Sequence, residues 1–205
     1  MNTRTGRPGN VTDDALTAAL AARLDAGFEQ VVLAYQHRLY AFALRISGSP
    51  QDAEEIAQDA FVRAYRALQT YEAARVCALA LRPWLFSIVL NIYRNRVRRH
   101  QPAQTPLDDD DDDTPHLQIV GDAHDWPEAA AEAAEQRREL ALVIAGLPPR
   151  YRIAVVLRHV EGVGYCEIAE TLGQPVGTVK ANVHRGTRLL REALVTRRRL
   201  EEVAG

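Results

Sequence analysis

The sequence predicts an all-α protein with two small helical domains joined by an extended acidic linker. Apolar residues recur at three- and four-residue steps over several long segments, as in helices that bury one face. No alternation of apolar and polar residues extends beyond four residues, so nothing indicates a strand. A proline-rich acidic segment interrupts the helical pattern near the middle of the chain. The 205 residues are 47% hydrophobic and 25% charged, which is typical of soluble globular proteins.

The first predicted domain spans residues 13–100 and follows a polar tail, residues 1–12, that we expect to be disordered. Short breaks rich in glycine, serine and proline separate its helices. The apolar stripes predict helices at residues 13–25, 27–46, 51–69 and 83–99. Residues 70–82 carry no pattern that decides between helix and loop.

Two of these helices carry charges of opposite sign. The helix at 51–69 buries an apolar face and leaves acidic and amide side chains available to a basic partner helix: Asp52, Glu55, Gln58 and Asp59. The helix at 83–99 ends in a run of arginines, which suits the phosphates of a nucleic-acid duplex: Arg94, Arg96, Arg98 and Arg99. The two helices therefore predict different partners.

The predicted linker, residues 101–127, concentrates negative charge. It contains eight acidic residues, six of them in the run 108–113, and neither lysine nor arginine. The net charge of the whole chain is −2, but the remaining residues include 19 acidic and 25 basic side chains, a net charge of +6. This separation of charge indicates basic surfaces for nucleic acid and an acidic, flexible tether.

The second predicted domain, residues 128–200, contains a helix-turn-helix. We expect helices at residues 128–145, 148–161, 165–172 and 176–195. Ala169 stands where two helices must nearly touch, and Gly173 follows at the end of the short helix, where a positive φ is favoured. Val179 lies six residues further on, inside the next helix, where it can pack back on the first. This spacing is typical of two helices that cross at a sharp angle.

The second helix of this motif has an apolar side and a basic side. At 100° per residue, the side facing solvent comprises Lys180, Ala181, His184, Arg185 and Arg188, which we call the recognition face. Such a helix suits the major groove of DNA. Arg185 is the candidate for a bidentate contact to guanine, whereas Lys180 and Arg188 are candidates for phosphate contacts.

Three segments together resemble the sigma-70 family of bacterial RNA polymerase sigma factors, in its compact extracytoplasmic-function (ECF) group. They are DAEEIAQDAFVRAYRAL at 52–68, WLFSIVLNIYRNRVRR at 84–99, and LPPRYRIAVVLRHVEG at 147–162 followed by the helix-turn-helix. Their order and their spacing across a linker are similar to those of the family.

The resemblance implies that the chain directs core RNA polymerase to promoter DNA, with an anti-sigma factor as a further partner. Core polymerase would bind the acidic helix at 51–69. The helix at 83–99 would melt and read the promoter's minus-ten element through Asn91, Arg94 and Arg98, and the recognition face would read the minus-thirty-five element. In the family the loop before Trp84 holds a flipped base, but here residues 70–82 are apolar and longer, with Tyr71, Arg75 and Arg82 as weaker candidates.

Other functions remain open at this point. A two-domain helix-turn-helix regulator would share the recognition face without needing a polymerase-binding helix. An enzyme is disfavoured because no pairing of a nucleophile with a base is legible, and consecutive aspartates in a flexible segment do not preorganise a metal site. We therefore expect no cofactor. Cys77 and Cys166 are interpreted as packing residues of a reducing cytoplasm, and no apolar segment is long enough for membrane insertion.

Overall fold

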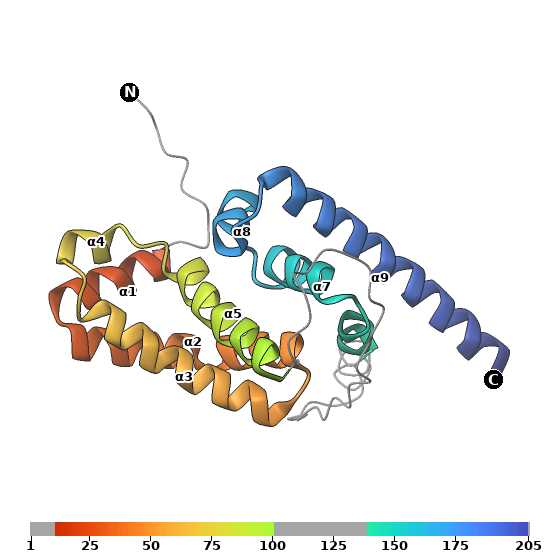
Figure 1. Ribbon diagram of the computed structural model, residues 1–205, viewed down its shortest axis with the longest axis horizontal. Coiled ribbons are helices and arrows are strands. Elements are labelled where there is room, and N and C mark those ends of the chain that lie inside the picture. Colours follow the sequence, from red (N-terminus) through yellow and green to blue (C-terminus); the bar gives the residue numbers. More distant parts are fainter. Residues whose placement is uncertain (1–10, 101–138, 205) are drawn as a thin grey trace.

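The structure, a computed structural model, describes residues 11–100 and 139–204 (Figure 1). Its elements are α1 (Val11–Ala22), α2 (Leu24–Ser47), α3 (Pro50–Leu68), α4 (Ala73–Cys77), α5 (Leu81–His100), a helical segment at residues 139–145, α7 (Pro149–Val155), the π-helix η1 (Val156–Val160), α8 (Tyr165–Leu172) and α9 (Val176–Ala204). These residues contain helices and no strand, so the predicted all-α fold is confirmed. The predicted linker and the start of the helix expected at 128–145 lie outside the described residues.

The first domain is built on two long helices, α2 and α3, with α5 packed against both. The stripe predicted on α2 is buried, with Val31, Leu39 and Phe42 fully enclosed. Phe42 meets Phe86 of α5 at 4.7 Å between ring centroids. This packing fixes α5 relative to α3, the two helices whose charged side chains were expected to bind different partners.

The turn between α2 and α3 lies at the glycine-, serine- and proline-containing break in the sequence. Gly48 ends α2 with a φ of 75°, and its N–H donates to the Leu44 carbonyl. The Ser49 hydroxyl accepts the Asp52 N–H at 3.2 Å, and Pro50 occupies the first position of α3. Asp52 is thereby placed in the first turn of α3.

The N-terminal boundaries differ from the prediction in two respects. Val11 and Thr12 belong to α1 and not to a disordered tail. The break between the first two helices falls at Arg23, which is extended, so Gly27 lies inside α2. Gly27 allows close crossing of α1, because a Cβ there would lie 2.5 Å from the backbone nitrogen of Leu20.

The second domain contains one feature that periodicity does not predict. The single helix expected at 148–161 changes to π geometry at Val156, and the Glu161 N–H donates to the Val156 carbonyl at 2.9 Å. Beyond the turn at Gly173, α9 continues to Ala204, nine residues past its predicted end. Its C-terminal part extends away from the first domain (Figure 1).

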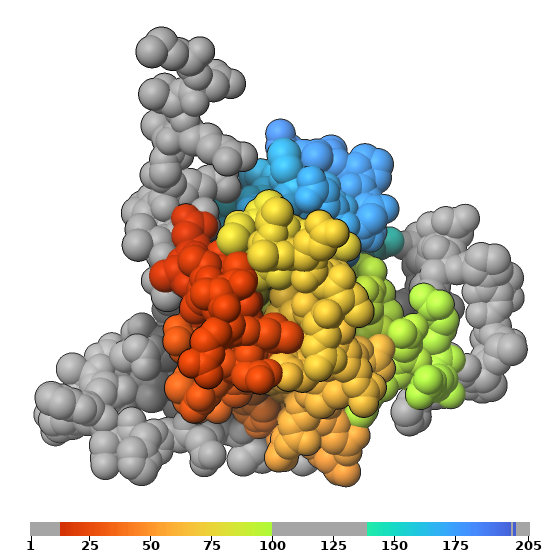
Figure 2. Space-filling view, turned by 90° about the vertical axis from the view of Figure 1, so that its left-hand side faces the viewer, coloured from red at the N-terminus to blue at the C-terminus, as the bar shows by residue number. Residues whose placement is uncertain are grey.

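The two domains pack directly on each other. α7 contacts α2, and α8 contacts α5. Buried apolar residues form one cluster that runs from the first domain into the second, through Ile153, Leu157 and Ile168 among others. In Figure 2 the second domain (blue) lies immediately against the first. The structure therefore shows a closed arrangement of two domains, each with its own predicted binding surface.

Candidate nucleic-acid interface

The helix-turn-helix forms as its spacing predicts. Gly173 has a φ of 65°, and its N–H donates to the Glu170 carbonyl at the end of α8. Ala169 and Val179 are buried between α8 and α9, beside Ile168 and Val183. This packing sets the angle at which α9 leaves the motif and leaves its opposite side in solvent.

All five side chains of the recognition face are exposed: Lys180, Ala181, His184, Arg185 and Arg188. Arg188 forms a 3.6 Å ion pair with Glu192, but both side chains remain more than 60% exposed. A hydrogen bond from Arg185 lowers the pKa of Tyr151 on α7, so the Arg185 side chain lies next to α7. Exposed ion pairs contribute little, about 0–1 kcal/mol, so these side chains can exchange their partners for DNA.

Gly186 supports this face and was missed by the sequence reasoning. It is buried where α9 crosses α7, and a Cβ there would lie 2.5 Å from Val155 Cγ2 and 3.2 Å from Tyr151 Cβ. A glycine in the middle of an otherwise regular basic helix is the signal that indicates such a close crossing.

The exposed side of α5 carries the residues predicted to meet the minus-ten element. Asn91 is exposed, and it shares one side of the helix with Arg94 and Arg98 at spacings of three and four residues. Burial lowers the pKa of the Arg94 guanidinium, and the neighbouring charge of Arg98 adds to the effect. The three residues form a positive surface, which we call the α5 face.

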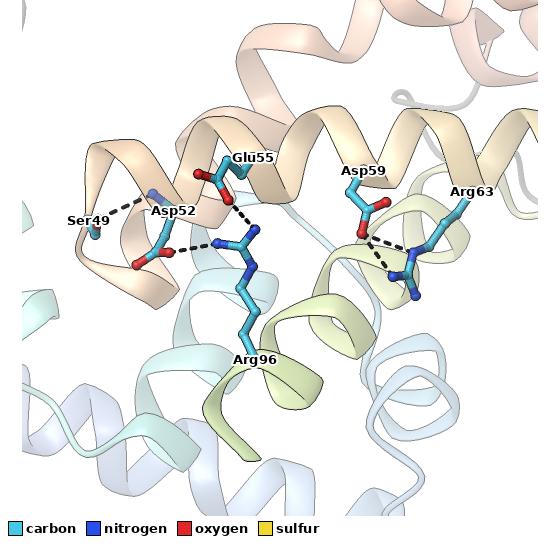
Figure 3. A network of polar contacts seen from close by, with 6 residues as sticks. All are labelled: Ser49, Asp52, Glu55, Asp59, Arg63 and Arg96. Carbon is cyan, nitrogen blue, oxygen red and sulfur yellow. Dashed lines mark hydrogen bonds and ion pairs between the residues drawn. The ribbon is translucent and has the colours of Figure 1, made fainter. Parts of the chain in front are cut away.

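Arg96 does not point to this side with the other arginines. Its Nη1 lies 2.7 Å from Asp52 Oδ1, and its Nη2 lies 2.5 Å from Glu55 Oε2 (Figure 3). These carboxylates raise the pKa of the Arg96 guanidinium despite an opposing effect of partial burial. The expectation that all four arginines would be directed at phosphates is therefore wrong for Arg96 in this arrangement.

The acidic helix α3 is thus engaged in internal ion pairs. Besides the two carboxylates held by Arg96, Asp59 pairs with Arg63 at 2.9 Å, and Gln58 donates to Glu54 at 3.3 Å. These side chains were expected to be available to a partner. A partner of α3 first has to displace these weak internal contacts. On the apolar side of the same helix, Phe61 is half-buried and lines a cavity of about 360 Å³ between α2 and α3.

Residues 70–80 form a turn, the short helix α4 and a second turn, whereas Leu81 and Arg82 already belong to α5. The Arg75 guanidinium stacks over the Tyr71 ring at 3.7 Å, and Tyr71 lies 6.2 Å from the ring of Trp84. Arg82 turns away from them: its Nη2 lies 3.3 Å from Asp13, and its Nη1 donates to the backbone carbonyl of Glu161. Arg82 is therefore a contact between the domains in this structure and not a candidate for contacting bases.

Glu161 is the centre of this contact between domains and was not predicted. Its carboxylate lies 3.3 Å from Arg38 and 3.8 Å from Arg45, both on α2. Burial raises the pKa of Glu161, while the charges of Arg38, Arg45 and Arg82 lower it, and the net shift is upward. Removal from water is therefore the larger of the two effects.

Arg152 is a second buried charge at the same boundary. It donates to the backbone carbonyls of Ala145 and Leu147 within its own domain, and to that of Ile46 near the end of α2. Burial lowers the pKa of its guanidinium. Carbonyl oxygens at helix ends carry partial negative charge, so these backbone contacts favour the buried guanidinium and join the two domains.

Comparisons with known proteins agree with this geometry. Residues 31–103 match the family model described as Sigma-70 region 2, and residues 137–190 match Sigma-70, region 4. The ECF RNA polymerase sigma factor SigW of Bacillus subtilis is 33% identical over 170 residues, which cover 82% of this chain and 88% of that protein. The chain belongs to the ECF sigma factors of the sigma-70 family.

Solved structures share the fold of this sigma factor. CnrH, in complex with the cytosolic domain of CnrY, has a TM-score of 0.61 at 24% identity and covers 90% of this chain and 98% of its own. RpoE of Bartonella quintana, in complex with the anti-sigma factor NepR, has a TM-score of 0.59 at 22% identity, covering 82% and 96%. The two likenesses support the fold alone.

Three further observations bear on the earlier expectations. Cys77 and Cys166 are both exposed, so their interpretation as packing residues is wrong. Within residues 11–100 and 139–204, no group of three or more histidine, cysteine or acidic side chains is arranged to hold a metal ion. Among the helices in those two ranges, none combines the length and the apolar character that a membrane span requires.

Proposed function

We propose that the two domains of this sigma factor divide promoter recognition between the α5 face and the recognition face, while α3 binds core RNA polymerase. The observation that carries this proposal is the placement of two separate basic surfaces. Asn91, Arg94 and Arg98 lie on the first domain, and the exposed side of the helix-turn-helix lies on the second. One small basic surface per domain binds DNA weakly, so specificity requires both at once.

On the recognition face, Arg185 is proposed to read a guanine, and Lys180, His184 and Arg188 are proposed to fix the helix in the groove. Ala181 leaves room for close approach of the base edges. On the α5 face, the amide of Asn91 can donate to and accept from a base edge exposed by melting, while Arg94 and Arg98 hold phosphates. These roles follow from chemical type and position: all of these side chains are exposed except that of Arg94, which is partly buried.

Reading both elements requires the domains to separate. Positions minus ten and minus thirty-five are about 25 base pairs apart, or roughly 85 Å of B-form DNA. A domain of about 100 residues has a radius of gyration of about 13 Å, so two domains in direct contact do not span that length. We infer that the closed arrangement is the form of the free protein, and that binding to core polymerase opens it.

We also infer that an anti-sigma factor regulates this chain. Two structures with the same fold are complexes: CnrH is bound to the cytosolic domain of CnrY, and the sigma factor RpoE of Bartonella quintana is bound to the anti-sigma factor NepR. Sigma factors are initiation factors, so we propose that this chain has no catalytic activity and that the core polymerase synthesises the RNA. Its site of action is then the cytoplasm, where polymerase and chromosome are located.

A binding titration against core RNA polymerase tests the role of α3. The double variant D52N/E55Q removes two charges and keeps the shape of the side chains, and we expect it to bind core more weakly, with the loss greatest at low ionic strength. The matched control is Glu170→Gln, which removes an exposed carboxylate from α8. Equal affinity of the double variant and the control would show that core polymerase does not use this acidic surface. A wild-type chain without affinity for core would instead indicate an ordinary helix-turn-helix regulator.

A further inference from the structure

Arg185, the residue proposed to read a guanine, is in contact with a tyrosine of a different helix. α7 packs against α9 (Figure 1), and the two helices approach closely at Gly186, where a Cβ would lie 3.2 Å from Tyr151 Cβ and 3.3 Å from the Tyr151 carbonyl oxygen. Arg185 directly precedes Gly186, so its side chain leaves α9 at the edge of this crossing. There the hydroxyl of Tyr151 accepts a hydrogen bond from Arg185.

The position of Tyr151 is itself well fixed. Its N–H donates to the Pro148 carbonyl at 3.0 Å in the first turn of α7. The residue is buried, at 7% exposure, and the Arg150 guanidinium lies over its ring at 4.8 Å. A buried aromatic ring in a helix has few rotamers available, so the Tyr151 hydroxyl is a fixed point at the rim of the crossing.

Arg185, in contrast, is an exposed side chain with many rotamers. When such a side chain binds a base it loses rotamer freedom, and this loss weakens binding. A hydrogen bond to a fixed hydroxyl removes part of that freedom before DNA arrives. The contact between Arg185 and Tyr151 therefore prepares the arginine for a defined geometry.

The chemistry of this pair leaves Arg185 able to read a base. A guanidinium has five N–H donors, and a bidentate contact to guanine uses two of them. The phenol oxygen can therefore hold one edge while another edge meets the base. A hydroxyl also accepts this bond without cancelling the positive charge, whereas the neighbouring Arg188 is paired with the Glu192 carboxylate at 3.6 Å.

We propose that Tyr151 is a positioning residue for base recognition, whose hydroxyl holds one edge of the Arg185 guanidinium so that another edge faces the major groove. This inference rests on the proposed role of Arg185. Both residues belong to the second domain, so the contact does not require the closed arrangement. Specificity for the upstream element then depends on a residue of α7, which lies outside the helix-turn-helix.

The first arm of the test measures the mobility of Arg185 in the free protein. Tyr151→Phe removes the hydroxyl and keeps the ring, and it leaves no buried donor without a partner because Arg150 and Arg185 are exposed to water. The urea midpoint should therefore stay near that of the wild type. Relaxation of the side-chain Nε of Arg185, measured by NMR, should show increased motion, with Arg188 as the internal reference. Unchanged motion of Arg185 would overturn the inference.

The second arm measures base preference in the holoenzyme, with promoter fragments randomised around position minus thirty-five as the probe. Tyr151→Phe should lower the preference for guanine at the base pair read by Arg185 about two- to tenfold, the value of one hydrogen bond. The slope of log K against log salt concentration should not change, because no phosphate contact is removed. Tyr65→Phe is the matched control, since it removes a hydroxyl that donates to Asp25 at 2.6 Å in the first domain.

A double-mutant cycle distinguishes positioning from a general structural effect. In the Arg185→Ala background, Tyr151→Phe should have no further effect on base preference. An equal loss in both backgrounds, or a lower salt slope in Tyr151→Phe, would overturn the inference. If Arg185→Ala relaxes the preference and Tyr151→Phe does not, the role of Arg185 stands and positioning by Tyr151 falls. If Arg185→Ala leaves the preference unchanged, the proposed role of Arg185 fails, and positioning for base recognition fails with it.

Discussion

Arg38 of α2 and Glu161 of the second domain form an ion pair of 3.3 Å across the boundary between the domains. The carboxylate is only 5% exposed, whereas the arginine is 38% exposed. Burial disfavours the charged form of the Glu161 carboxylate more strongly than the positive charges of Arg38, Arg45 and Arg82 favour it. The pKa of Glu161 is therefore raised. The pair therefore fixes how the domains meet without being a strong source of stability.

This relationship predicts that domain closure depends on pH. The raised pKa means that the closed form binds the proton of Glu161 more tightly than an open form with an ordinary carboxylate. Stabilisation by that proton is complete below the ordinary value of 4.5 and is lost as pH rises through the raised pKa. We therefore expect closure to strengthen as pH falls through that window, by up to about tenfold for each unit of pKa difference.

The two native cysteines allow the distance between the domains to be measured as a function of pH without added mutations. Cys77 lies on the first domain and Cys166 on the second, and both are exposed. Spin labels at these two positions report the distance between domains, and Glu161→Gln, which cannot titrate, is the control. A pH response of the same size in Glu161→Gln would assign the effect to other groups.

Gly186→Ala is expected to destabilise the second domain. The added Cβ would lie 2.5 Å from Val155 Cγ2 and 3.3 Å from the Tyr151 carbonyl oxygen, so α7 and α9 must move apart. Overpacking of this kind costs about 1–3 kcal/mol and should lower the midpoint of urea unfolding. Gly177→Ala is the matched control, because nothing lies within 4 Å of its added Cβ. Equal midpoints for the two variants would show that the crossing is not tight.

Arg185→Ala and Arg188→Ala should affect upstream promoter DNA differently. Loss of a bidentate base contact at Arg185 costs about 1–3 kcal/mol and relaxes preference at one base pair. Loss of a phosphate contact at Arg188 weakens binding to all sequences and reduces the salt slope by about 0.9. Holoenzyme binding to a library of upstream sequences separates the two. Unchanged preference in Arg185→Ala would exclude it from base recognition.

Asn91→Ala should impair promoter melting more than initial binding. Asn91 is exposed on α5, and its proposed partner is a base that becomes accessible only when the duplex opens. Permanganate footprinting of holoenzyme on a promoter should therefore show fewer reactive thymines in the variant, at a saturating concentration where duplex binding is complete. Wild-type reactivity under those conditions would remove Asn91 from the proposed site.

The sequence predicts the local features of this fold well. The helix-turn-helix depends on residues close in sequence, so the positions of Ala169, Gly173 and Val179 are enough to place it. The turn at Gly48 and Ser49 is similarly local, because a positive φ and a hydroxyl cap act within a few residues. Apolar periodicity also identifies the buried sides of α2 and α3.

The contacts missing from the prediction are those between distant segments. Periodicity gives the direction of Arg96 around α5 but not its partners on α3, and it gives no reason to bury Arg152 or Glu161. The packing of the domains decides all three. The π-helix at Val156 is not predicted for a related reason. Its residues favour a helix as much as those of α7 do, and its π geometry is set by the residues that surround it.

The central claim is that this chain directs core RNA polymerase to promoters, and transcription in vitro tests it most directly. Purified chain is mixed with core polymerase and fragmented genomic DNA of the source organism, and the 5′ ends of the RNA are mapped. We expect a defined set of start sites with shared sequences near positions minus ten and minus thirty-five. These start sites should be absent with core alone and reduced by Asn91→Ala or Arg185→Ala. Start sites that are the same with and without the chain would contradict the account.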